Sequence, residues 1–255
     1  MKQFTKICLV ICIMLGILGS ALCVAAFSLG ASIEDVEEMI ADGEFQIGEG
    51  MIDAKKIIAN TQNVEKNFSK IDSLKIEVGV EEVAIYVYGG DEIQVKAENV
   101  TSTFQCTQSG KTLKIKDEGP KINLNIFSER RNSKIDIYLP ETWELKELDL
   151  EVGVGSVETE EITVESLNID CGVGSVYFRG NVKTEGKVEC GIGEVKMDLS
   201  GEQTEYNYKM ECGVGSIQIG DDYESSIPGK KYIDNNAKKE FAIECGIGSV
   251  KIEFI

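Results

Sequence analysis

A short glycine-containing unit recurs along the second half of the chain, and it constrains the fold more than any other feature. The unit reads acid, Cys or Val, Gly, Val or Ile, Gly, Ser or Glu, and Val or Ile. Its five copies begin at Glu151, Asp170, Glu189, Glu211 and Glu244, and their second positions are 19, 19, 22 and 33 residues apart. This period is too short for a helical hairpin and is typical of one coil of a β-solenoid. A degenerate sixth copy spans Glu77 to Val83.

Residues around each copy alternate between apolar and polar, as on a half-buried strand. In the copy at Asp170, the pattern predicts that Cys171 and Val173 point inward and that Asp170 points outward. Stacking coils at about 4.8 Å would bury the apolar rows, because no single coil can cover its own face. The predicted fold is all-β, a solenoid of coils of 19 to 22 residues.

The paired glycines are predicted to be structural. We expect them to provide a positive-φ bend where the chain turns a corner or bulges. They are Gly153, Gly155, Gly172, Gly174, Gly191, Gly193, Gly213, Gly215, Gly246 and Gly248.

Residues 70–147 alternate in the same way, between turn signals rich in glycine. The predicted strands are Leu74 to Val78, Val83 to Val87, Ile93 to Ala97, Leu113 to Lys116, Ile122 to Ile126 and Ile135 to Leu139. Residues 70–255 are therefore predicted to form one domain, in which Gly229 to Lys239 is a lysine-rich insertion before the last coil. That coil ends at Ile255 with no visible cap, which suggests self-association at this end.

An apolar run, Ile7 to Leu29, is long enough to cross a membrane, because its 23 residues would span roughly 35 Å as a helix. Lys2 and Lys6 precede it and acidic residues follow it, so residues 1–6 are predicted to be cytoplasmic and the rest extracytoplasmic. Residues 7–29 are the predicted single-pass anchor in the cell membrane, and residues 30–69 a short helical stalk.

Two other interpretations of the same run remain open. One is a cleaved signal peptide with Val24-Ala25-Ala26 as its small-residue site, although the apolar run is long for such a core. The other is a lipoprotein signal that ends at Cys23, but Leu22 stands where a small residue is expected.

Charge and composition exclude several classes of function. The net charge is −18, and such an excess of carboxylates repels phosphate backbones, so we expect no nucleic-acid partner. The chain has no histidine, which removes the commonest general base and a common metal ligand. No set of residues forms a recognisable catalytic site, so we expect neither an enzyme nor a cofactor.

Cysteine occupies the second position of four copies, at Cys171, Cys190, Cys212 and Cys245. The interpretation that we favour is a row of buried thiols that act as small apolar side chains. Disulfides between adjacent coils are the alternative, because the Cα spacing is compatible although parallel side chains fit the S–S torsion poorly. A zinc or iron–sulfur site is disfavoured, because ligands stacked in a line do not converge on one ion.

The acidic first positions, Glu151, Asp170, Glu189, Glu211 and Glu244, are expected to stack on an outer face. A solvated acidic face is the favoured interpretation, and a Ca²⁺ or Mg²⁺ ladder is the sharper hypothesis. A glycosidase pair is disfavoured, because these acids recur in every coil and no unique pair stands out.

Together, three features resemble a family of Gram-positive envelope proteins described as adhesins with β-strand repeats. They are the Gly-x-Gly-Ser-Val coils, the strand Lys134 to Pro140 just before them, and Ile233 to Ala237 before the last coil. The resemblance covers about residues 70–255. It implies a domain of unsettled function behind an N-terminal membrane helix.

The resulting expectation is a non-catalytic, membrane-anchored binding or scaffold protein. Its partners would be a cell-wall polymer, another surface protein or a second copy of the chain. The alternative is an accessory protein of an envelope-stress sensing system that acts through Ile7 to Leu29, and a carbohydrate-active enzyme is a third, weaker possibility.

Overall fold

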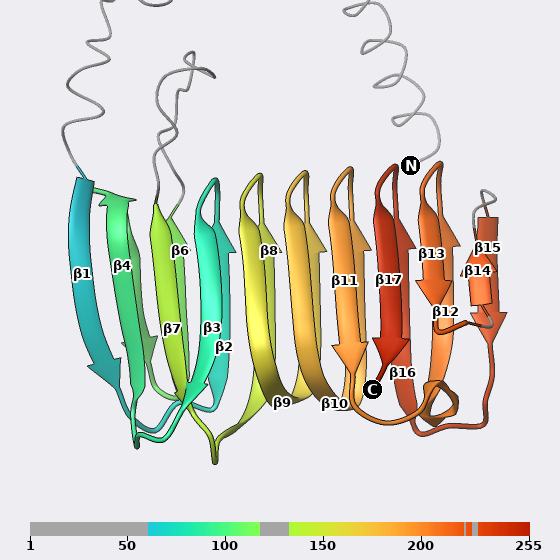
Figure 1. The fold of residues 1–255 in the computed structure, drawn as a ribbon, viewed down its shortest axis with the longest axis horizontal. Coiled ribbons are helices and arrows are strands. Elements are labelled where there is room, and N and C mark those ends of the chain that lie inside the picture. Colours follow the sequence, from blue (N-terminus) through green and yellow to red (C-terminus); the bar gives the residue numbers. More distant parts are fainter. Residues whose placement is uncertain (1–60, 118–132, 222, 226–228) are drawn as a thin grey trace, which may run out of the picture. The chain divides into compact units, whose positions relative to one another are not determined.

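The computed structural model describes residues 61–117, 133–221, 223–225 and 229–255. These residues form an all-β domain whose coils stand side by side in a row (Figure 1). Among them, no helix is long and apolar enough to cross a membrane. The predicted anchor at Ile7 to Leu29 and the stalk up to residue 60 lie outside the described residues.

Each coil consists of two strands, which are joined by a tight turn wherever the connection lies within the described residues. The strand pairs are β2 (Ser73–Val78) with β3 (Glu82–Tyr88), β6 (Thr112–Asp117) with β7 (Lys134–Pro140), β12 (Tyr206–Cys212) with β13 (Ser216–Ile219), and β16 (Lys239–Cys245) with β17 (Ser249–Phe254). Between them run β8 (Glu144–Val152), β9 (Ser156–Cys171), β10 (Ser175–Cys190) and β11 (Glu194–Leu199). β9 and β10 are long because each closes one coil and opens the next.

The strands form two layers that share a core. The first layer holds the strands that enter the turns, in the order β6, β2, β8, the second half of β9, the second half of β10, β16 and β12. The second layer holds the strands that leave the turns, in the order β7, β3, the first half of β9, the first half of β10, β11, β17 and β13. All these pairs are parallel, and their registers align the repeat copies, with two register shifts between β9 and β10.

The coils do not stack in chain order at either end of the row. The last coil of the chain, β16–β17, lies between β10–β11 and β12–β13, so both of its strands are paired on both sides. Likewise, β2–β3 lies between β6–β7 and the coil formed by β8 and β9. The prediction that the C-terminal coil is uncapped is therefore wrong. Because both of its strands are already paired, this coil has no free edge for self-association.

Antiparallel strands cover both ends of the row. At one end β5 (Gln105–Ser109) pairs with β6, β4 (Ile93–Thr101) pairs with β7, and β1 (Thr61–Phe68) pairs with β4. At the other end β15 (Gly229–Ile233) pairs with β12 and β14 (Tyr223–Ser225) pairs with β13. These pairings cover the edges of β6, β7, β12 and β13, and leave the antiparallel strands β1, β5, β14 and β15 outermost. A three-residue 3-10 helix, η1 (Gln203–Glu205), precedes β12.

The antiparallel strands change two predicted boundaries. Residues 61–68 were assigned to the stalk, yet they form β1, so the β domain begins at least as early as Thr61. The insertion that begins at Gly229 forms β15 on the edge of β12. Five of the six predicted early strands are present, and Ile122 to Ile126 lies outside the described residues.

Candidate functional site

The paired glycines lie in turns at one edge of the row, which we call the turn edge (at the top in Figure 1). None of the ten has a positive φ, so the predicted positive-φ bend is wrong. Their role is close approach: a Cβ at Gly174 would lie 2.0 Å from the carbonyl oxygen of Gly155, and one at Gly193 would lie 2.1 Å from that of Gly174. Backbone hydrogen bonds continue the ladder through the turns, as from Val173 N to Gly153 O at 2.8 Å.

The residue between the two glycines points into solvent in all five Gly-x-Gly turns, and so does Val80 in the related Gly79-Val80-Glu81 turn. Val173 was predicted to face the core, but 54% of its surface is exposed. The equivalents, in their order along the row, are Val80, Val154, Val173, Ile192, Ile247 and Val214. We call this set the aliphatic row. The inward alternation ends at the cysteine because the tight turn reverses the chain there.

The repeat cysteines form a buried row directly beneath the turns. Register places them in the order Cys171, Cys190, Cys245 and Cys212, and all four are buried free thiols. The thiols of Cys190, Cys212 and Cys245 each donate a hydrogen bond of 3.1 Å to the carbonyl oxygen of the second glycine of the same turn. Burial raises the pKa of the Cys245 thiol to about 11, so this thiol is a poor nucleophile. This arrangement supports the interpretation of structural thiols.

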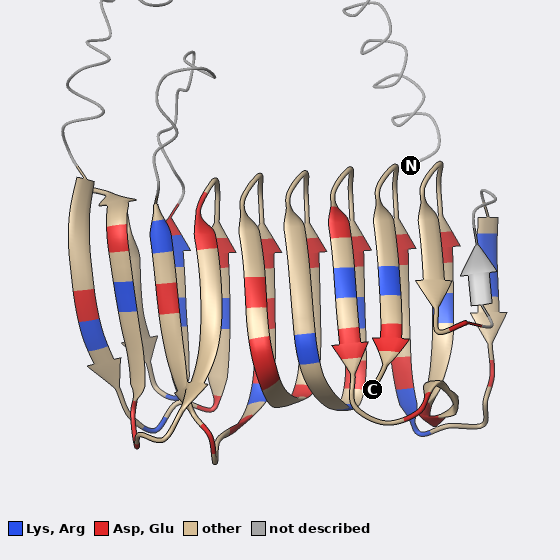
Figure 2. Ribbon diagram, viewed as in Figure 1, with Lys and Arg blue, Asp and Glu red and all other residues tan. Residues whose placement is uncertain are grey.

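The acidic first positions also stack in register, on the outer face of the first layer. Their order along the row is Glu77, Glu151, Asp170, Glu189, Glu244 and Glu211, and a lysine stands opposite each end, Lys116 beside Glu77 and Lys230 beside Glu211. Figure 2 shows acidic residues recurring near the upper ends of these strands.

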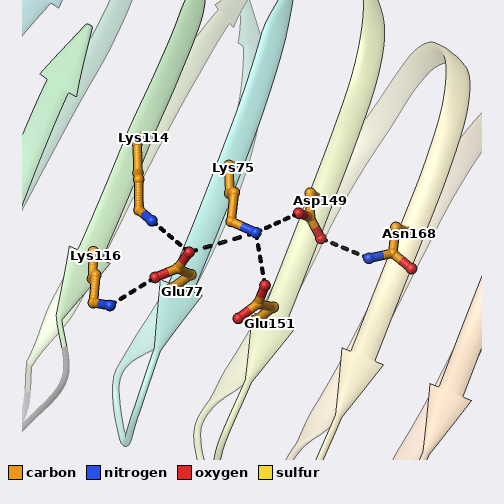
Figure 3. A network of polar contacts seen from close by, with 7 residues as sticks. All are labelled: Lys75, Glu77, Lys114, Lys116, Asp149, Glu151 and Asn168. Carbon is orange, nitrogen blue, oxygen red and sulfur yellow. Dashed lines mark hydrogen bonds and ion pairs between the residues drawn. The ribbon is translucent and has the colours of Figure 1, made fainter. Parts of the chain in front are cut away.

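Lysines interleave the acidic row at its β2 end (Figure 3). Lys75 Nζ lies 2.8 Å from an Asp149 carboxylate oxygen and 2.7 Å from one of Glu151. The Glu77 carboxylate contacts Lys114 at 2.6 Å and Lys116 at 3.0 Å. Burial opposes ionisation of Glu77, yet the hydrogen bonds from these two lysines outweigh it and lower the pKa of Glu77 to about 2.

In the middle of the same row, the surroundings raise a carboxyl pKa instead of lowering it. Burial, together with the charges of Glu189 and Glu151, raises the pKa of Asp170. Within the described part of the chain, no group of three or more acids and cysteines is arranged to hold a metal ion. Because one carboxylate per coil faces outward along a line, this geometry favours a solvated acidic face.

A shallow depression lies on the outer face of the second layer, and the sequence analysis did not predict it. Its volume is about 360 Å³, and it crosses four adjacent coils. Its lining includes Glu82, Ala84, Ser156, Glu158, Ser175, Tyr177, Glu194 and Lys196. The side chains of Ala84, Ser156 and Ser175 are too small to fill this space, and the depression results. Lys196 Nζ lies 5.4 Å from the centre of the Tyr177 ring, at one side of it.

The outward residues of the second layer could have indicated this depression. Ser156 and Ser175 follow the second glycine of their turns, and register places them side by side. A serine at that position in adjacent copies predicts a strip of small polar side chains once the register is known.

The fold defines a class, all-β proteins built from stacked coils with turns along one edge. The chain belongs to the Toastrack DUF4097 family, a domain of unknown function, whose model matches residues 71–252. The resemblance to a family of β-strand-repeat proteins of unsettled function is thereby confirmed. No curated protein matches the chain.

Several solved crystal structures are similar to this chain. A candidate cell adhesion protein from Clostridium sporogenes is 19% identical, with a TM-score of 0.55, and the match covers 77% of this chain and 100% of that one. A candidate adhesin from Bacteroides fragilis is 16% identical, with a TM-score of 0.40, over 75% and 97% of the two chains. The first of these supports the fold of this chain.

Proposed function

We propose that this protein is a non-catalytic binding or scaffold protein of the cell surface with an adhesin-like role. In this proposal Ile7 to Leu29 anchors it in the membrane, and the β domain faces outward. The similarity to a candidate cell adhesion protein supports the adhesin-like role. The apolar run behind Lys2 and Lys6 supports the anchor and its orientation.

The depression on the second layer carries the proposal. It crosses four coils, and strands in a sheet are about 4.8 Å apart, so it is about 15 to 20 Å long. That shape suits a segment of an extended polymer better than a compact molecule. Glu158, Glu194 and Lys196 provide hydrogen-bonding groups, and the Tyr177 ring provides an apolar surface for a sugar face. We therefore propose a cell-wall polymer as the partner.

Binding of purified wall polymer to the full-length protein tests the proposal. Tyr177→Ala and Lys196→Ala should each weaken binding about tenfold, as expected for the loss of one good contact. Lys251→Ala is the matched control, because Lys251 stands beside Lys196 on the next coil but does not line the depression. Equal effects of the Lys196 and Lys251 substitutions would contradict the proposed site.

A second experiment tests the location. On intact cells, protease should remove a tag placed after Ile255 and spare a tag placed before Lys2. Protection of the C-terminal tag until lysis would contradict the surface location. Exchanging Ile7 to Leu29 for an unrelated span should leave polymer binding intact. A loss of function on that exchange would instead support the envelope-stress accessory role.

A further inference from the structure

Among the described residues, the aliphatic row accounts for six of the eight exposed large apolar side chains, and the fold does not explain it. Its six members are 46% to 78% exposed and follow one another along the turn edge, one per coil. Five of these residues stand between two glycines, whereas Val80 stands between Gly79 and Glu81. Nothing in the core requires an apolar residue there, and an exposed turn would ordinarily carry Asn, Asp or Ser. Six aliphatic side chains in line therefore indicate a surface that is covered.

The flanks of the aliphatic row differ in charge. On one side lies the acidic row, from Glu77 to Glu211. On the other lies the residue after the second glycine, which is Ser156, Ser175, Ser249 or Ser216 in four coils and Glu82 or Glu194 in two. An aromatic or basic residue is absent from the row itself.

These flanks argue against a lipid surface as the occupant. Segments that insert into the membrane interface combine Trp, Phe or Leu with Lys or Arg. Here the aliphatic row contains only Val and Ile, and the neighbouring carboxylates would be repelled by anionic lipids. A protein surface with an apolar centre and a polar rim fits better.

We propose that the aliphatic row binds the same row of a second copy of this chain. A second copy has the same spacing of one aliphatic side chain per coil, about 4.8 Å, so contacts made at one coil repeat at the others. Each row exposes about 600 Å² of apolar surface, taking roughly 100 Å² per side chain, so a pair would bury about 1,200 Å². This value lies at the lower limit for a specific interface.

Charge determines how the two rows are oriented. Two copies can be related by a two-fold symmetry axis that runs along the row. Each side chain then lies beside its counterpart in the other copy, and each acidic row faces a flank that is mostly serine. With the rows running in opposite directions, acidic row would face acidic row along its whole length, which is unfavourable. The first arrangement therefore brings Val80 to Val80 and Val214 to Val214.

Disulfide cross-linking of the full-length chain in its membrane tests both the contact and the orientation. Val80→Cys and Val214→Cys lie at opposite ends of the aliphatic row, and each should give a covalent dimer on mild oxidation with copper phenanthroline. Tyr232→Cys is the control for an exposed apolar residue off the row, since Tyr232 is 55% exposed on β15. The unmodified chain gives the background of its native thiols.

The paired substitution Ile192→Gln and Ile247→Gln should lower the Val80→Cys dimer about tenfold, because it removes two adjacent apolar contacts of the row without touching the core. Unchanged thermal unfolding would show that the fold is intact. Cross-linking at Val80 and Val214 no stronger than at Tyr232, or unaffected by the paired Ile192→Gln and Ile247→Gln substitution, would overturn the proposal. So would an environment-sensitive dye on Ile192→Cys that enters lipid vesicles while no dimer forms.

Discussion

The two edges of the coil row are built in different ways. At the turn edge, five turns share one Gly-x-Gly geometry and differ only in side chains. At the opposite edge the connections vary: β9 and β10 bend continuously around it, whereas β11 and β12 are joined through η1. Gly180 has a φ of 147° at one such bend, and a Cβ there would lie 1.8 Å from the carbonyl oxygen of Ile162.

This difference separates two tasks. The turn edge determines how closely coils stack, because the glycines bring neighbouring backbones into contact at every coil. The opposite edge determines which coil stacks on which. The connection from β11 to β12 passes the position that β16 and β17 occupy, and that from β7 to β8 passes β2 and β3. A few extended residues, at about 3.3 Å each, suffice to bridge one coil.

The largest effect should come from adding one methyl group at the turn edge. Gly174→Ala would place a Cβ 2.0 Å from the Gly155 carbonyl oxygen and 3.1 Å from a Val152 methyl group, so the coils must separate. We expect a loss of more than about 3 kcal/mol in the free energy of unfolding, or failure to fold. Urea unfolding, followed by circular dichroism, measures this loss in the free energy of unfolding.

Gly89→Ala is the matched control at the opposite edge. Gly89 follows β3, a Cβ there meets nothing within 4 Å, and its φ is not positive. The substitution should change the unfolding free energy by less than about 0.5 kcal/mol. Similar losses for the two variants would show that the coils tolerate wider spacing at the turn edge.

A smaller effect should come from the thiols beneath the turns. Cys190→Ala removes a buried sulfur and its hydrogen bond to the Gly193 carbonyl oxygen, so we expect a loss of about 1 to 2 kcal/mol. Cys190→Ser keeps a donor at this position and should lose less, and the two variants can be compared by thermal unfolding. If alanine were the better tolerated of the two, the hydrogen bond would contribute nothing.

The sequence predicted the regular part of the domain for a physical reason. Alternation and the repeat are local signals, so the coils, the buried Cys171 row and the outward Asp170 row could be recognised from them. Coil order depends on long-range pairing, and a coil such as β16–β17 has the same pattern wherever it stacks. The depression beside Tyr177 could not be located for the same reason, since it forms only when four coils are in register.

Val173 and the glycines illustrate a second limit. Alternation continues through the turn in the sequence, but the chain reverses direction there, so the inward assignment of Val173 failed. Glycine in a turn suggests a positive φ, yet here it allows contact between coils, which depends on a neighbour that a single copy does not reveal.

The smallest effect concerns the one turn that departs from the pattern, Gly79-Val80-Glu81. Glu81 stands where the other turns have their second glycine, and it is 1% exposed. Its Oε2 accepts hydrogen bonds from the backbone N–H groups of Gly79, at 2.8 Å, and Val80, at 2.9 Å. Among the described residues its Oε1 is buried without a hydrogen-bond partner. Burial, assisted by the charge of Asp117, raises the pKa of Glu81.

A raised pKa in the folded state means that the native protein binds a proton more tightly than the unfolded chain does. Stability therefore falls as the pH rises from the unfolded value, about 4.5, through the folded pKa of Glu81, and that contribution is constant above it. Glu81→Gln keeps an oxygen for the two N–H groups but carries no charge. The free energy of unfolding of this variant should therefore exceed that of the parent above this pH range and equal it below. Thermal unfolding between about pH 4 and pH 8 measures the difference. Glu82→Gln, on the exposed neighbouring residue, is the control, and an identical pH dependence in the Glu81 variant and its parent would show that the turn imposes no cost on the buried carboxylate.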